Sequence, residues 1–242
     1  MALLRLDKYL ADMQIGSRSE VKDLVRKGKV RINGLPAAKA DMKINTDSDV
    51  VYVDGQPVGY VEMEYYILNK PAGVLSAARD KKAQTVLDLI EDKNRKDLFP
   101  VGRLDKDTEG LLLITNDGPL SHELLSPKKH VDKVYYARVQ GHMAEREVKA
   151  FAEGLYIDEE FTALPSKLDI LSYDEKSDTS TIHVTVHEGK FHQVKRMFES
   201  VNSEVLYLKR LSMGTLQLDE SLKPGEYRNL TEDEVMQLKS RT

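Results

Sequence analysis

The chain is built around the stretch Gly102-Arg103-Leu104-Asp105-Lys106-Asp107-Thr108-Glu109-Gly110-Leu111-Leu112-Leu113-Ile114-Thr115-Asn116-Asp117-Gly118. The part between the first two glycines is polar, whereas residues 111–115 lack the alternation of a half-exposed strand. This pattern predicts a displayed loop followed by a strand that is covered on both faces. Asp117-Gly118 is expected to form the turn that closes the strand. Loops held on buried elements often carry chemistry, so the acids of this loop are the first candidates.

Length and composition set the outer limits. A chain of 242 residues can form one or two domains. It contains no cysteine, which removes disulfides, thiol nucleophiles and thiolate zinc sites. No apolar run approaches the ~20 residues that a membrane span needs, and the early acid Asp7 is unlike a secretory signal, so we expect a cytoplasmic protein without membrane association. The net charge of −4 does not indicate a nucleic-acid binder, so basic residues have to be read where they cluster.

The first 58 residues predict a small domain. Residues 5–13 place apolar side chains at helical spacing, and Ser17-Arg18-Ser19-Glu20 has the form of a capping box before a second helix. Asn33-Gly34 indicates a hairpin, and Asp54-Gly55 ends a further strand. Six basic residues fall on the second helix and the strand after it, opposed only by Glu20 and Asp23. They are Arg18, Lys22, Arg26, Lys27, Lys29 and Arg31. By charge alone, a solvated helix face and a nucleic-acid surface are equally good interpretations.

Three segments of this domain resemble the alpha-L RNA-binding domain, which is named after small-subunit ribosomal protein S four. They are Arg5-Leu6-Asp7-Lys8-Tyr9-Leu10, the helix start at Ser17-Arg18, and Gly28-Lys29-Val30-Arg31-Ile32-Asn33-Gly34. The resemblance covers most of residues 1–58 and implies that the six basic residues bind RNA.

Residues 59–63 are expected to be a linker, and residues 64–242 a second domain. A strand at residues 65–68 leads into a turn that should expose Lys70. Lys128, Lys129 and Lys133 form a second basic segment before a strand at residues 134–139. A helical register at residues 191–198 would place Phe191, Val194 and Phe198 on one packed stripe, with Lys195 on another face.

Residue types alone do not identify a reaction. Of the six histidines, only His183 and His187 share a predicted strand face, and no third ligand is near, so no metal is expected. No Gly-x-Ser-x-Gly elbow is present. Asp105 and Asp107 remain, but both are also typical turn residues whose carboxylates bond to backbone amides. Catalysis and turn formation are both open at this level.

Five motifs resemble pseudouridine synthases of the RsuA type, which act on ribosomal RNA. They are the Gly102 to Gly118 stretch, Asn69-Lys70-Pro71-x-Gly73, Lys133-Val134-Tyr135, Glu188-Gly189-Lys190-x-His192-Gln193-Val194-Lys195-Arg196-Met197, and Pro224-Gly225-Glu226-Tyr227-Arg228-x-Leu230. With the first domain, the resemblance spans nearly the whole chain. It implies isomerisation of a uridine within RNA, in which the N1–C1′ bond breaks, the uracil turns and a C5–C1′ bond forms. It also implies that no cofactor takes part.

The resemblance assigns roles to individual residues. Asp105 would be the essential carboxylate, which attacks C1′ or C6 or removes a ribose proton to give a glycal. Tyr135 would stack on the uracil and help to remove the C5 proton, and Val194 would pack beside the base. Lys195 would pair with Asp105, although Arg196 is the alternative partner in a register shifted by one residue. Arg103 would fill the gap left by the flipped uridine.

The predicted architecture is α+β, with a small RNA-binding domain followed by a catalytic domain on a mainly antiparallel mixed sheet. Lys70, Arg196, Lys128, Lys129 and Lys133 are expected at the substrate. The short chain without a basic tail and the motif spelling favour 16S rRNA, or a small-subunit assembly intermediate, as partner of a monomeric enzyme. The alternatives are a synthase that acts on 23S rRNA and a non-catalytic RNA-binding assembly factor.

Overall fold

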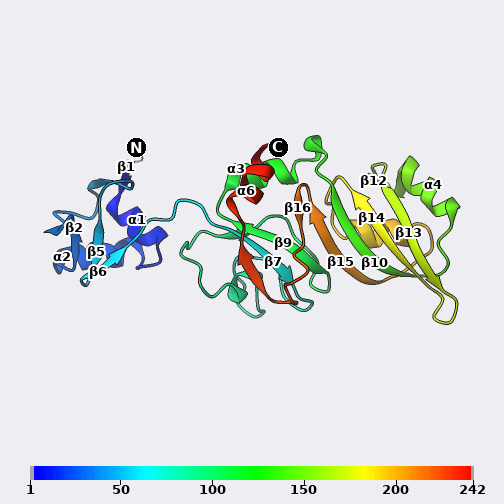
Figure 1. The fold of residues 1–242 in the computed structure, drawn as a ribbon, viewed down its shortest axis with the longest axis horizontal. Helices are drawn as coiled ribbons and strands as arrows, with labels where there is room; N and C mark the ends of the chain where they lie inside the picture. The colour runs from blue at the N-terminus through cyan, green and yellow to red at the C-terminus, as the bar shows by residue number, and fades with distance from the viewer. Residues whose placement is uncertain (1–2, 241–242) are drawn as a thin grey trace. The chain divides into compact units, whose positions relative to one another are not determined.

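The computed structural model describes residues 3–240, which form two compact units (Figure 1). Within these residues, the first unit comprises residues 3–64 and 91–98, and the second comprises residues 65–90 and 99–240. This division differs from the continuous second domain expected from residue 64, because residues 91–98 return to the first unit. No helix within residues 3–240 is long and apolar enough to cross a membrane.

The first unit contains two helices and two small sheets. Its elements are β1 (Leu3–Arg5), α1 (Leu6–Asp12), α2 (Arg18–Arg26), β2 (Val30–Ile32), β3 (Leu35–Pro36), β4 (Lys43–Asn45), β5 (Val51–Val53) and β6 (Gln56–Val58). β1 pairs with β4, and the other four strands form an antiparallel sheet in the order β3-β2-β5-β6. The predicted capping box at Ser17 and Glu20 is confirmed, and so is the hairpin turn, where Asn33 and Gly34 both have positive φ.

Residues 91–98 are held to the first unit by polar contacts. The Arg95 side chain is 4% exposed and donates to the Val61 carbonyl at 3.1 Å, and it lies 3.5 Å from the Asp12 carboxylate. The Glu64 carboxylate accepts from the backbone N–H of Arg95 at 2.8 Å, and the Asp12 carbonyl accepts from that of Lys96 at 3.0 Å. The first unit is therefore completed by a segment that follows part of the second unit in the chain.

The second unit is organised by a nine-stranded sheet. Its main path runs β13-β14-β10-β15-β9-β7-β17, with β16 paired to β15 and β8 paired to β9. The strands are β7 (Tyr65–Lys70), β8 (Phe99–Pro100), β9 (Glu109–Thr115), β10 (Lys133–Gln140), β13 (Lys167–Asp174), β14 (Thr179–Val186), β15 (Val205–Met213), β16 (Leu216–Gln217) and β17 (Tyr227–Asn229). Only the β15–β9 pair in this sheet is parallel among residues 3–240. The predicted α+β class with a mainly antiparallel mixed sheet is confirmed.

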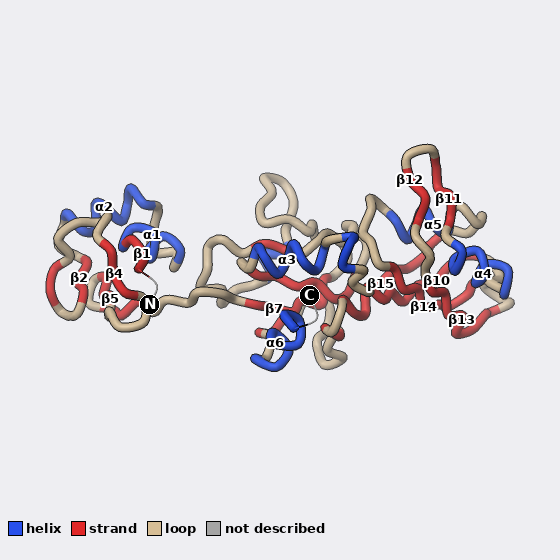
Figure 2. Tube along the Cα trace, turned by 90° about the horizontal axis from the view of Figure 1, so that it is seen from above, coloured by secondary structure: helices blue, strands red, loops and turns tan. Residues whose placement is uncertain are grey.

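Helices and one hairpin pack around this sheet. They are the 3₁₀ helices η1 (Val86–Leu89) and η2 (Pro127–Lys129), the helices α3 (Gly118–Leu125), α4 (Glu145–Glu153), α5 (Gln193–Glu199) and α6 (Glu232–Ser240), and the hairpin β11 (Leu155–Asp158) with β12 (Phe161–Ala163). Figure 2 shows α4, α5 and this hairpin on one side of β10, β14 and β13. The turn predicted at Asp117-Gly118 is instead a helix start, because the Asp117 carboxylate accepts from the Leu120 N–H at 3.0 Å and caps α3.

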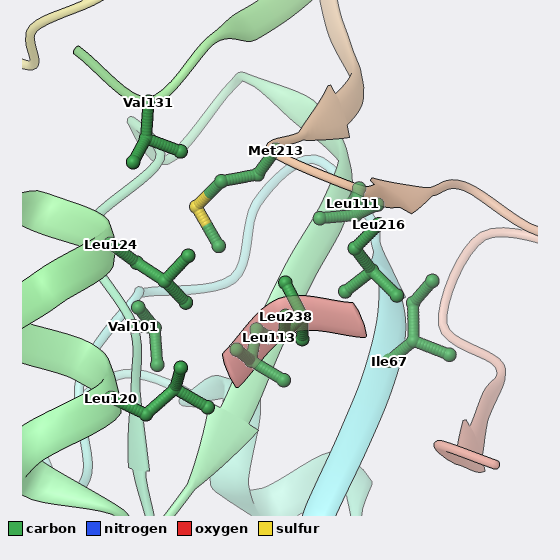
Figure 3. Packing of buried hydrophobic residues seen from close by; sticks show 10 residues of the cluster. All are labelled: Ile67, Val101, Leu111, Leu113, Leu120, Leu124, Val131, Met213, Leu216 and Leu238. Atoms are coloured by element: carbon green, nitrogen blue, oxygen red, sulfur yellow. The ribbon is translucent and has the colours of Figure 1, made fainter. Parts of the chain in front are cut away.

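The hydrophobic core of the second unit confirms the predicted buried strand. Six residues of β9, from Gly110 to Thr115, are buried. Leu111 and Leu113 pack with Leu120 and Leu124 of α3, as Figure 3 shows, and with side chains from β7, β15 and α6. A strand buried on both faces holds its N-terminal end in a fixed place, and the loop that precedes it carries Asp105.

Candidate active site

A pocket in the second unit brings together five of the predicted site residues from three separate segments of the chain. The loop before β9 supplies Arg103 and Asp105, β10 supplies Tyr135, and α5 supplies Val194 and Lys195. The complete lining is Arg103, Leu104, Asp105, Thr108, Tyr135, Val186, Glu188, Gly189, Lys190, His192, Gln193, Val194, Lys195 and Leu208.

Hydrogen bonds to Ser76 and within the loop hold the backbone around Asp105. The Ser76 hydroxyl donates to the Leu104 carbonyl at 2.8 Å and accepts from the Leu104 N–H at 3.1 Å. The Thr108 N–H donates to the Asp105 carbonyl at 3.1 Å. The Asp105 carboxylate itself is 26% exposed and lies 3.5 Å from the Lys195 ammonium and 3.6 Å from His192 Nε2. A partly exposed carboxylate on a fixed backbone is well placed to meet a substrate.

Lys70 corrects one prediction. Its side chain was expected at the surface of a turn, but it is fully buried. The ammonium donates to four backbone carbonyls, those of Pro71, Asp105, Lys106 and Thr108, at 2.9 to 3.2 Å. Burial lowers the pKa of Lys70 to about 8. Lys70 therefore holds the Asp105 loop from inside rather than contacting a substrate.

Lys195 lies between two carboxylates. Its ammonium donates to both oxygens of Asp107, at 2.7 and 2.8 Å, and is 3.5 Å from the Asp105 carboxylate. The hydrogen bond from Lys195 holds the pKa of Asp107 below its usual range. The predicted pairing of Lys195 with Asp105 is thus a longer contact than its pairing with Asp107. The alternative partner, Arg196, instead pairs with Asp158 of the β11–β12 hairpin.

Tyr135 and Val194 contribute two largely buried side chains to the pocket lining. Tyr135 is 9% exposed on β10, where its backbone lies opposite Val184 of β14 and Arg210 of β15. Val194 is 6% exposed in the first turn of α5. Arg103 is exposed and also lines the pocket. Tyr135, Val194 and Arg103 therefore line one pocket.

The second basic segment is not uniform. Lys128 and Lys129 are exposed, and Lys129 pairs with Glu123 at 2.7 Å. Lys133 is buried, and its ammonium donates to the Val131 carbonyl at 2.8 Å, so its predicted contact with substrate is wrong. Burial, with Arg210 nearby, lowers the pKa of Lys133 to about 8. Position in a basic run did not predict this burial, although the alternation of β10 does place Lys133 on the same face as Tyr135.

The segment before α5 contains residues that the sequence reasoning missed. Phe191 precedes the helix and is 76% exposed, so its predicted packing with Val194 and Phe198 is wrong. Its ring stacks on that of His192, with centroids 3.8 Å apart and planes at 18°. His192 has no predicted role beyond the excluded metal site, yet its Nε2 lies 3.6 Å from the Asp105 carboxylate. The left-handed backbone of His192 starts α5 late and turns Phe191 out of the helix.

The basic residues of the first unit lie on its surface. All six predicted members, Arg18, Lys22, Arg26, Lys27, Lys29 and Arg31, are exposed. Arg26 pairs with Asp23 at 2.6 Å, and Lys29 pairs with Asp54 at 3.0 Å. Such exposed pairs are weak, so these side chains can exchange carboxylates for phosphates at low cost. Within residues 3–240, no group of three or more His, Asp or Glu side chains is arranged to hold a metal.

Comparison with family models matches both parts of the chain. A model described as RNA pseudouridylate synthase matches residues 64–200, and an S4 domain model matches residues 4–51. A solved structure titled "Crystal structure of pseudouridylate synthase" shares 36% identity and a TM-score of 0.67, and the match covers 97% of this chain and 99% of that chain.

Curated relatives are similar over nearly their full length. An uncharacterized RNA pseudouridine synthase of Bacillus subtilis is 48% identical over 96% of this chain and 97% of the relative. Ribosomal large subunit pseudouridine synthase B of the same organism is 40% identical over 98% of this chain and 96% of the relative. Ribosomal small subunit pseudouridine synthase A of Vibrio cholerae is 37% identical over 96% and 98%.

Proposed function

Because the chain belongs to the RNA pseudouridylate synthase family, and is thus an isomerase of ribosomal RNA, we propose that Asp105 is its catalytic carboxylate. One observation carries this assignment. Asp105 is partly exposed in a pocket with Tyr135 and Val194, while Lys70 and Ser76 fix the backbone on either side of it. Asp107, the other acid of the loop, has a 71% exposed side chain and is already bound by Lys195.

The proposed reaction conserves every atom of the uridine. The N1–C1′ bond breaks, the uracil turns, C5 bonds to C1′, and the proton that C5 loses is balanced by one gained at N1. Asp105 starts the reaction as a nucleophile at C1′ or C6, or as a base on the ribose. Tyr135 stacks on the uracil and assists removal of the C5 proton, and Val194 packs against the ring. Lys195 orients the Asp105 carboxylate.

The uridine has to leave its stack to reach this pocket. We propose that it flips, and that Arg103, exposed at the pocket, fills the vacated place. This contact offsets an unstacking cost of a few kcal/mol. Uridines in loops or single strands are favoured because their bases are displaced most easily. The first unit, whose residues 4–51 match the S4 domain model, would bind phosphates with its basic residues, aided by Lys128 and Lys129 of the second unit.

The proposed substrate is 16S rRNA, free or in a small-subunit assembly intermediate, modified by a monomeric enzyme in the cytoplasm. The likeness to a small subunit synthase and the motif spelling support this target. A second candidate, 23S rRNA, is favoured by the 40% identity to a large subunit synthase.

Mapping of pseudouridine on both rRNAs tests these proposals. Carbodiimide-blocked reverse transcription is carried out after treatment with the wild type, with Asp105→Asn, and with Asp107→Asn as the matched control. We expect a new stop in 16S rRNA with the wild type and Asp107→Asn but none with Asp105→Asn. A stop in 23S rRNA instead would identify 23S rRNA as the substrate. A stop that is still present with Asp105→Asn would show that Asp105 is not the catalytic carboxylate. Absence of any stop would favour a non-catalytic assembly factor.

A further inference from the structure

The side chain of Phe191 is unusual in its exposure. At 76% it is the most exposed of the large hydrophobic side chains within residues 3–240. A phenyl ring this exposed buries little apolar surface in the fold, and here it also lies outside the helix that its sequence pattern predicted. A function at the surface would account for its position.

The segment that carries Phe191 is firmly built. Gln193 is buried, and its amide oxygen accepts from the Lys190 N–H at 2.9 Å while its nitrogen donates to the Glu188 carboxylate at 3.0 Å. Glu188 also accepts from the Leu164 N–H at 2.9 Å. Residues 188–193 are therefore tied on both sides of Phe191, so its ring is held outward by a defined loop.

The phenyl ring of Phe191 is linked to the proposed catalytic carboxylate, Asp105, through His192. Asp105 lies 3.6 Å from His192 Nε2, and the imidazole stacks on the phenyl ring with nearly parallel planes. Because His192 covers one face of Phe191, the high exposure places the opposite face in solvent. Lys190 and Arg103 line the same pocket and are exposed. Aromatic rings combined with cations are the means by which proteins hold single-stranded nucleic acids.

We infer that Phe191 is a stacking platform for the nucleobase next to the target uridine, with Lys190 available to the phosphate between them. The inference rests on the proposed function for the identity of the target. A neighbouring base that has lost its stacking partner to flipping regains one on the phenyl ring. Stacking is tolerant of base identity, so the platform would add affinity rather than sequence preference.

Fluorescence offers a test that is independent of catalysis, because the chain contains no tryptophan. Phe191→Trp introduces one fluorophore at the platform, and Met236→Trp introduces one at a side chain of α6 that is 61% exposed. We expect an rRNA fragment that contains the target uridine to quench the tryptophan fluorescence of Phe191→Trp. The fluorescence of Met236→Trp should not change. Equal responses of the two variants, or no response of Phe191→Trp, would overturn the inference.

Affinity gives the second test, with full-length protein. Phe191→Ala should weaken binding of the fragment about ten-fold, and Phe191→Trp should restore the affinity. An abasic site on the flanking side that stacks should abolish the difference between wild type and Phe191→Ala. An unchanged dissociation constant in Phe191→Ala would refute the platform. A wild type that makes no pseudouridine would contradict the proposed function alone, because quenching still reports stacking.

Discussion

At the scale of single residues, the position of Lys195 is the feature with the clearest consequence. Its ammonium is 2.7 Å from the Asp107 carboxylate and 3.5 Å from that of Asp105, so without substrate Lys195 pairs mainly with the exposed Asp107. Under the proposed function, Lys195 acts on Asp105 in the pocket, and Asp107 only positions Lys195 near it.

Substitution of the two residues separates these roles. Lys195→Met should lower the single-turnover rate by about a hundred-fold, because Asp105 loses its cation, whereas Asp107→Asn should cost less than about five-fold. Rates are measured with saturating RNA, and thermal unfolding verifies that both variants are folded. If Asp107→Asn were as damaging as Lys195→Met, Lys195 would act through Asp107 and the assignment would change.

Lys133 gives the folded state a dependence on pH. Its pKa is about 8 in the folded protein and about 10.4 in an unfolded chain, so between these values the unfolded chain binds more protons. Stability should therefore rise with pH across this window. Between pH 7.5 and 9.5, urea unfolding should show a gain about 2 kcal/mol larger for the wild type than for Lys133→Met. Lys129→Met, at an exposed position, should keep the wild-type slope; equal slopes for all three proteins would contradict the prediction.

At the scale of elements, β9 connects the two sides of the sheet. It pairs antiparallel with β7 and parallel with β15, at Glu109 and Gly110. Gly110 has a φ of +99°, and a Cβ there would meet the Arg210 carbonyl and lie 2.8 Å from the Arg210 nitrogen. The parallel junction therefore requires glycine for both conformation and space.

Gly110→Ala should be destabilised by roughly 3 kcal/mol or more, because backbone cannot move aside as a flexible side chain can. The matched control is Gly118→Ala at the start of α3, where a Cβ meets nothing within 4 Å. We expect the control to change stability by less than about 1 kcal/mol. Urea denaturation measures both, and similar stabilities for the two variants would show that the β9–β15 junction can yield.

The sequence predicted elements well where local physics decides them. Burial of residues 111–115, the capping box at Ser17 and the Asn33-Gly34 hairpin follow from pattern and turn chemistry, and all are confirmed. The prediction for Lys70 failed because its burial depends on carbonyls that the distant Asp105 loop supplies. The prediction for Lys133 failed because a basic run does not reveal that β10 is an inner strand of the sheet, between β14 and β15. Phe191 failed because His192 adopts a left-handed backbone, which apolar spacing does not reveal. The pocket of Asp105, Tyr135 and Lys195 required family resemblance, since no spacing connects three separate segments.

At the scale of the whole molecule, the net charge of −4 conceals the exposed basic residues of the first unit. Lys27→Glu with Arg31→Glu should weaken RNA binding by ten- to a hundred-fold and reduce the slope of log K against log salt by about 2. The matched control is the double variant Lys149→Glu with Lys167→Glu, which reverses two charges in the second unit. These side chains are 69% and 70% exposed. Filter binding at several salt concentrations measures both proteins. Identical salt slopes for the two double variants would show that the first unit does not grip RNA.

The return of residues 91–98 to the first unit has a consequence for synthesis. Domains generally fold as units as the chain leaves the ribosome, with the N-terminal one first. Here Arg95, which bonds to Val61 and lies beside Asp12, is translated after β7 and η1 of the second unit. The first unit thus stays incomplete until residue 98 has emerged, and its last contacts form while the nascent chain already carries the beginning of the catalytic sheet.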